Sequence, residues 1–179
     1  MPDFYALGEL EQIAVNLFYG WGYNFYRREN QLRADDLTVR AKVSGLLGAA
    51  RASVEAAESA FRAQNLPPPS REKPRPDPSA LAGAQALEKL SAGIGALEGQ
   101  IRALPAPESD RMNQRYRNEA ETLQKLLQSD IALAGRAELL RQMLQGKDGD
   151  WLVENALAVR GGLQAIEAAL RERAAALAV

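Results

Sequence analysis

The 179 residues of this chain include no cysteine and no histidine. Disulfides, thiolate nucleophiles, imidazole acid–base catalysis, haem ligation and the usual zinc sites are therefore excluded. A metal would have to be a hard cation bound by carboxylate and carbonyl oxygens. The sequence also lacks a P-loop, a dinucleotide-binding glycine fingerprint and a serine nucleophile elbow. We expect a non-enzymatic protein with no cofactor and no metal site.

Long apolar runs are missing as well. The most apolar window, residues 13–26, spans only 14 residues and contains Asn16 and Asn24. A bilayer crossing needs about 20 apolar residues, so this window is too short and too polar. The first residues include Asp3 and no cationic stretch, unlike a secretory signal. The sequence predicts a cytoplasmic protein without a membrane partner.

β-branched residues are scarce, whereas Ala, Leu, Glu, Arg and Gln are abundant, which favours helices. Apolar residues recur at spacings of three and four. We expect one all-α domain over residues 1–179, an antiparallel helical bundle of about five helices with a proline-rich connector at residues 66–78. An aromatic first helix precedes two helix pairs separated by this proline spacer. The predicted helices span residues 3–25, 35–64, 77–104, 107–145 and 150–178.

The first helix is predicted to continue through Gly20 and Gly22, although each glycine costs about 1 kcal/mol relative to alanine. Asp35 is the expected N-cap of the second helix, and Asp77 followed by Pro78 that of the third. Asp148 and Asp150 indicate a turn and a helix cap, since they lack the spacing of a calcium loop.

The last three helices carry coiled-coil-like heptad seams. Two carboxylates, Glu119 and Asp130, fall on the seam of the fourth helix, where an unpaired charge would be costly. We expect them to pair with arginines of other helices, such as Arg160 or Arg173, and to fix the register of the bundle.

Aromatic residues are concentrated near the N-terminus. Six of the eleven lie within residues 18–26, and Arg27, Arg28 and Arg33 follow directly. Tyrosine, tryptophan and arginine are typical anchors of interfaces. Three interpretations remain open: a first helix that is central and covered on several sides, a helix that presents a groove, or a helix in contact with a membrane interface, which the few flanking lysines disfavour. The candidate binding residues are Tyr19, Trp21, Tyr23, Asn24, Tyr26, Arg27, Arg28, Asn30 and Arg33.

Three functional hypotheses follow. The leading one is a helical scaffold or protein-interaction module that uses residues 18–36 to bind a protein partner or a second copy, so that a dimer is expected. The alternative is a ligand-binding bundle that accepts a small anionic or aromatic molecule. The weakest is nucleic-acid binding, which a net charge of −1 disfavours. Its candidate residues are Arg27, Arg28, Arg33, Arg40 and Lys42.

Overall fold

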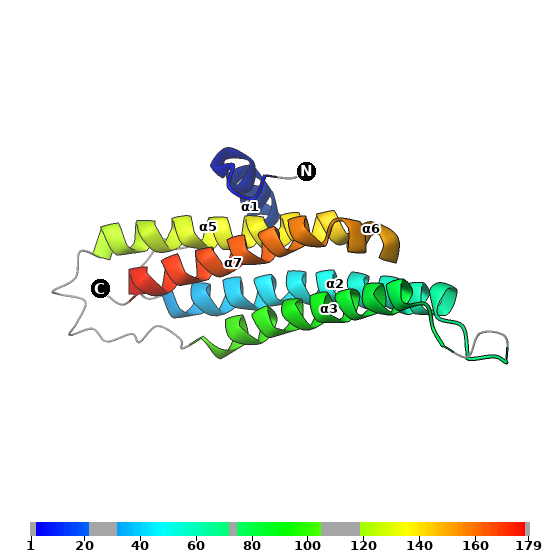
Figure 1. The fold of residues 1–179 in the computed structure, drawn as a ribbon. Helices are drawn as coiled ribbons and strands as arrows, with labels where there is room; N and C mark the ends of the chain where they lie inside the picture. Colours follow the sequence, from blue (N-terminus) through cyan, green and yellow to red (C-terminus); the bar gives the residue numbers. More distant parts are fainter. Residues whose placement is uncertain (1–2, 22–31, 72–74, 105–118, 178–179) are drawn as a thin grey trace.

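The computed structural model describes residues 3–21, 32–71, 75–104 and 119–177, and every regular element within them is a helix. The all-α bundle expected from the sequence is confirmed (Figure 1). The helices are α1 (Leu7–Trp21), α2 (Leu32–Asn65), α3 (Pro78–Ala103), α5 (Glu119–Leu144), α6 (Gly149–Glu154) and α7 (Ala156–Leu177). Across these ranges, no helix combines the length and apolar character that crossing a bilayer requires.

Two antiparallel hairpins form the bundle. Helix α2 packs against α3, and α5 packs against α7, with α6 at the turn between them (Figure 1). The hairpins lie side by side so that α2 contacts α5 and α3 contacts α7, and each of these two contacts joins helices that run in the same direction. The proline-rich connector joins α2 to α3, the two members of one hairpin. It does not separate the helix pairs as predicted.

Apolar residues at spacings of three and four predict a buried stripe along residues 35–64 and another along residues 77–104, and these stripes of α2 and α3 form about half of the core. All six stripe residues of α2 are buried: Val43, Leu47, Ala50, Val54, Ala57 and Phe61. The heptad positions of α3 are buried as well, except for the half-buried Leu104 just after its end: Leu87, Leu90, Ile94, Leu97 and Ile101. The periodicity of the sequence therefore identified the inward faces of this hairpin.

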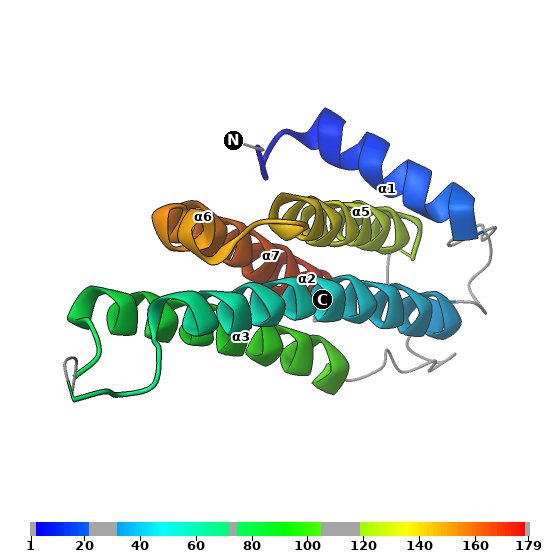
Figure 2. The same ribbon diagram turned by 90° about the vertical axis from the view of Figure 1, so that its right-hand side faces the viewer.

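Helix α5 is the central helix of the described structure. Residues 132–140 are nine consecutive buried residues, and α1, α2 and α7 all pack against α5. Helix α1 instead lies across the outer side of α5, outside the two hairpins (Figures 1 and 2). The interpretation that placed the first helix at the centre is wrong, because an apolar stripe along one side is enough to bury a helix against a single neighbour.

Several predicted helix ends are confirmed. The Asp77 carboxylate accepts hydrogen bonds from the backbone of Ser79 and Ala80 at the start of α3. Asp148 caps α6 by accepting a hydrogen bond of 2.8 Å from the Trp151 backbone N–H. Gly146 follows α5 with φ of +68°, a left-handed conformation that costs glycine little.

Two predicted boundaries are wrong, and a third is untested. Helix α1 begins at Leu7 because Asp3 accepts a hydrogen bond from the Tyr5 N–H and forms a turn instead of a helix. The described part of α2 begins at Leu32, so Asp35 lies inside the helix and is not its N-cap. The residues before Asp35 are good helix formers. The expected fourth helix is described from Glu119 onward, and its first twelve residues, together with Gly22, lie outside the described residues.

The predicted last helix is in fact two helices, α6 and α7, which meet at Asn155. The Asn155 side chain donates a 2.8 Å hydrogen bond to the Trp151 carbonyl, which also accepts the Asn155 backbone N–H at 2.9 Å. Asparagine side chains that bond to nearby backbone groups compete with helix continuation. The helical pattern resumes where Val159 donates to the Asn155 carbonyl.

Close packing of α1 on α5 depends on Gly135. A Cβ atom at this position would lie 2.7 Å from the Leu10 carbonyl oxygen and 3.2 Å from the Leu10 Cα, so the backbone of α1 would have to move. We expect Gly135→Ala to lower the free energy of unfolding by about 1–3 kcal/mol, the usual cost of overpacking. Chemical denaturation followed by circular dichroism measures this change.

Gly99→Ala is the matched control, because Gly99 is also helical but a Cβ there meets no atom within 4 Å. This substitution is expected to raise stability by up to about 1 kcal/mol through helix propensity alone. Equal stabilisation by both substitutions would contradict the close contact between α1 and α5.

Candidate functional site

The predicted binding residues lie around the connection from α1 to α2. Tyr19 and Trp21 belong to the end of α1, and Arg33 belongs to the start of α2. The other six lie outside the described residues: Tyr23, Asn24, Tyr26, Arg27, Arg28 and Asn30. Whether these nine residues form one surface therefore stays a prediction.

The structure describes the contacts of residues 4–14, which precede the predicted binding residues in the chain. The Phe4 ring is buried against Gly162 of α7, where an added Cβ would lie 2.7 Å from the ring. Leu10 is fully buried and its backbone lies on Gly135 of α5. We call the surface formed by Gly135, Arg136 and Gly162 the α1 seat, because Phe4, Tyr5 and Leu10 lie on it.

Arg136 is the polar anchor of the α1 seat. Its side chain is buried, with only 5% of the residue exposed, and its Nε donates a 3.1 Å hydrogen bond to the Phe4 carbonyl. The Nη1 atom donates to the Ala165 carbonyl at 2.9 Å, and the guanidinium lies 5.3 Å from the centre of the Tyr5 ring. Within the described residues, no carboxylate forms an ion pair with this guanidinium. One buried cation thus ties the N-terminal segment to both α5 and α7.

Arg136 is not among the residues predicted from the sequence. An isolated arginine in a helix is usually on the solvent face. A signal was present, however, because Arg136 stands inside the run IALAGRAELL, where small and apolar residues occupy all sides of the helix. Such a helix is covered all round, and a charged residue within it needs partners.

The predicted seam carboxylate is confirmed as a buried ion pair. Asp130 of α5 accepts a 2.6 Å hydrogen bond from Arg173 Nε of α7, and both side chains are at most 2% exposed. Arg160, the other suggested partner, is exposed. Glu119 begins the described part of α5, and its pairing stays a prediction. Because the Asp130–Arg173 pair forms in only one alignment of α5 and α7, it fixes their register.

A second charged network lies on α5 itself. The buried Glu138 carboxylate accepts two 2.7 Å hydrogen bonds from Arg141 and one of 2.8 Å from Gln142. Burial raises the pKa of Glu138, but the hydrogen bonds from Arg141 and Gln142 outweigh this effect and hold the pKa below its ordinary value. Arg141 also donates to Gln145, which fixes the position of its guanidinium. This network pairs the buried carboxylate with residues of its own helix.

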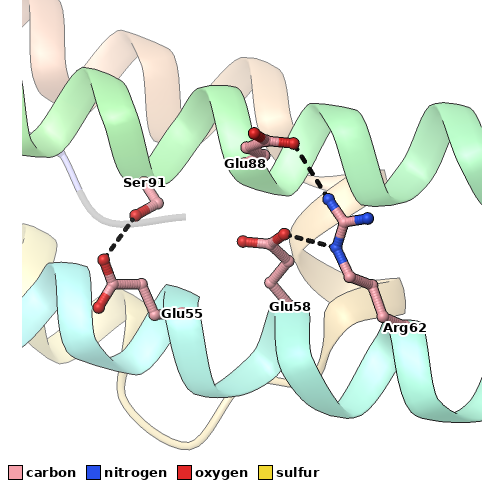
Figure 3. A network of polar contacts seen from close by, with 5 residues as sticks. All are labelled: Glu55, Glu58, Arg62, Glu88 and Ser91. Carbon is pink, nitrogen blue, oxygen red and sulfur yellow. Dashed lines mark hydrogen bonds and ion pairs between the residues drawn. The ribbon is translucent and has the colours of Figure 1, made fainter.

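Polar contacts also connect α2 with α3 (Figure 3). Arg62 donates to Glu58 on its own helix at 2.7 Å and to Glu88 of α3 at 3.0 Å. Ser91 donates to Glu55 at 3.2 Å. The Arg62 and Glu88 side chains are 40% and 66% exposed, and exposed pairs of this kind are worth about 0–1 kcal/mol. Their main effect is to align the two helices of the hairpin.

Arg40 and Lys42, two of the candidate nucleic-acid-binding residues, differ in their exposure to solvent. Arg40 is buried and donates to the Leu104 carbonyl at the end of α3, whereas Lys42 is exposed. The Arg40 side chain therefore connects α2 to the end of α3 inside the bundle. In the part of the chain that the structure describes, no three acidic side chains lie close enough together to hold a metal ion.

The Asp130–Arg173 pair gives a stability prediction. Arg173→Met leaves the Asp130 carboxylate buried without this cation, and we expect it to lower the free energy of unfolding by about 3–5 kcal/mol. In a double-mutant cycle with Asp130→Asn, a coupling energy of about 0.5–3 kcal/mol is expected from denaturant unfolding. The exposed pair Glu167–Arg171, 3.9 Å apart, is the control and should show at most about 1 kcal/mol. Similar coupling in both pairs would contradict the role of the buried one.

Glu138 gives a pH prediction. Because its folded-state pKa lies below the unfolded value of about 4.3, its contribution to stability is present above that pH and is lost as the pH falls through the folded-state pKa. Arg141→Gln removes the main hydrogen bonds and should cost roughly 1–3 kcal/mol near pH 7. The difference from wild type should shrink below about pH 4.3 when stability is measured by urea unfolding. An Arg171→Gln control should show no such pH dependence.

Comparison with protein-family models, with curated proteins and with solved structures gives no match to this chain. Its residues and their geometry are therefore the basis for a functional proposal.

Proposed function

We propose that this chain is a non-enzymatic helical interaction protein whose residues 18–36 bind another protein or a second copy of the chain. The observation that carries the proposal is the position of α1. This helix contains the first residues of the aromatic segment, by which we mean residues 18–26. It lies on the outer side of the bundle against α5 (Figure 2). The aromatic segment thus continues from a peripheral helix and not from the centre of the core.

The chemistry of the segment supports the same function. Residues 18–28 combine six aromatic side chains with two consecutive arginines, Arg27 and Arg28. Aromatic residues supply large contact areas and arginine supplies directed hydrogen bonds, and these types dominate the energetics of protein interfaces. The outward residues of α1 before this segment are polar and exposed: Glu9, Glu11, Gln12 and Asn16. The aromatic side chains that would anchor an apolar partner surface therefore follow Leu17 in the sequence.

The test is the double substitution Tyr23→Ala and Arg27→Ala. We expect it to reduce partner capture or the dimer fraction at least tenfold, because loss of one hot-spot residue of an interface costs about 2 kcal/mol or more. Native mass spectrometry at several protein concentrations measures self-association, and pull-down measures a different partner. The helical circular dichroism should stay unchanged.

The matched control is Leu157→Ala with Arg160→Ala, which removes one apolar and one arginine side chain from the exposed surface of α7. It should leave binding intact. Loss of the fold in the Tyr23 and Arg27 variant would assign these residues to stability and overturn the proposal. So would a small-molecule adduct on a monomer, which indicates a pocket, or nucleic-acid binding that weakens steeply with salt.

A further inference from the structure

We infer that residues 66–71, the first part of the proline-rich connector, are a docking site for a partner protein with an aromatic-lined groove that binds consecutive prolines. The segment has the sequence Leu-Pro-Pro-Pro-Ser-Arg and follows the last residue of α2. The inference goes beyond the proposed function, because it concerns a different surface from residues 18–36 and does not depend on them.

The covalent structure of this segment determines its conformation. Proline holds φ at about −65° and lacks a backbone N–H, so the three prolines at 67–69 cannot continue α2. A residue that precedes a proline is restricted to extended or polyproline II backbone, and this applies to Leu66 and to the first two prolines. At the other end of the connector, Asp77 precedes Pro78 and has φ of −63° and ψ of 126°, as the same rule requires. Residues 66–69 are therefore held in the polyproline II form before any partner binds.

The prolines are presented to solvent from a fixed starting point. All three prolines of the run are exposed, and so is Arg71. Leu66, by contrast, is partly buried against the core, and its backbone N–H donates a 2.9 Å hydrogen bond to the Arg62 carbonyl. Since the proline rings face solvent, packing within the bundle does not account for them.

The connection is also longer than the α2–α3 hairpin requires. It runs from residue 66 to residue 77, whereas the connection between α5 and α6 runs only from residue 145 to residue 148. Helices of a bundle are usually joined by about 2–8 residues. The described parts of the connector extend away from the end of the hairpin (Figures 1 and 2). The additional length leaves residues 66–71 accessible to a partner.

The chemistry of the segment defines the partner. A polyproline II helix has no internal hydrogen bonds and presents apolar rings, which dock in grooves lined by aromatic side chains. Because the conformation is already formed, little ordering entropy is lost on binding. The exposed Arg71 follows the prolines closely, and a carboxylate beside the groove is its complement. The connector contains no P-x-x-P spacing, which disfavours a groove of the SH3 type.

The test titrates the full chain against isolated WW, EVH1 and SH3 domains and follows binding by biolayer interferometry. Each WW and EVH1 domain is first verified with a polyproline peptide, and each SH3 domain with a P-x-x-P peptide. We expect saturable binding to WW or EVH1 domains and none to SH3 domains. Absence of binding to every verified WW and EVH1 domain would overturn the inference, and so would binding to SH3 domains alone.

A pair of matched variants then locates the site. Pro68→Ala with Arg71→Ala removes one proline of the run and the cation that follows it, and should weaken binding by about tenfold or more. Pro76→Ala with Arg75→Ala removes the same two types of exposed side chain from the other end of the connector and should leave the affinity unchanged. The circular dichroism of both variants should match that of the wild type, because all four side chains are exposed. Equal weakening by the two variants would contradict residues 66–71 as the site.

The outcome is distinguishable from that of the proposed function. Tyr23→Ala with Arg27→Ala should leave binding to the WW or EVH1 domain unchanged, whether or not it abolishes self-association or capture of another partner. Loss of domain binding in this variant, together with full binding by the Pro68 and Arg71 variant, would overturn the inference and assign the binding to residues 18–36.

Discussion

Burial of the segment 132–140 of α5 on all sides is the constraint on which the arrangement of the other helices depends. Nine consecutive residues, 132–140, are buried, and they belong to every side of a helix that turns once per 3.6 residues. Helices α2 and α7 cover two sides, and α1 must cover the third. Small residues make this coverage possible, because Ala132, Ala134 and Gly135 let the surrounding helices approach closely. The position of α1 outside the hairpins is thus a consequence of the composition of α5.

Charged groups inside this structure determine alignment more than overall stability. The Asp130–Arg173 pair fixes α5 against α7, and Arg136 fixes the N-terminal segment against both. Desolvation offsets much of the attraction within a buried pair, so its net energy is small although breaking it is costly. A mixture of small residues and leucines packs in more than one register, and these polar contacts select one.

Much of the fold could be predicted from the sequence, because periodicity and caps are local properties. The stripes of α2 and α3, the cap at Asp77 and the pairing of Asp130 with an arginine of the last helix were all predictable. The placement of α1 was not, because an apolar stripe shows which side of a helix is buried but not which neighbour buries it.

The break at Asn155 depends on one side-chain hydrogen bond. Close approach through a glycine likewise depends on the neighbouring helix: a Cβ added at Gly45 or Gly48 would meet no backbone of another element within 4 Å, whereas Gly135 and Gly162 are in tight contact. The candidate binding residues between α1 and α2 stay a prediction.

The contact between Phe4 and Arg136 joins residues 132 positions apart in the chain. At about 5–20 residues per second, ribosomal synthesis reaches Arg136 on the order of ten seconds after Phe4. During this interval α1 exists without the surface that buries Leu10 and Ala14. The two hairpins, by contrast, close over short connections and can form as they are made. The N-terminal helix is therefore the first part of the bundle to be synthesised and among the last to pack, and its apolar side is the surface that a nascent chain must keep from aggregation.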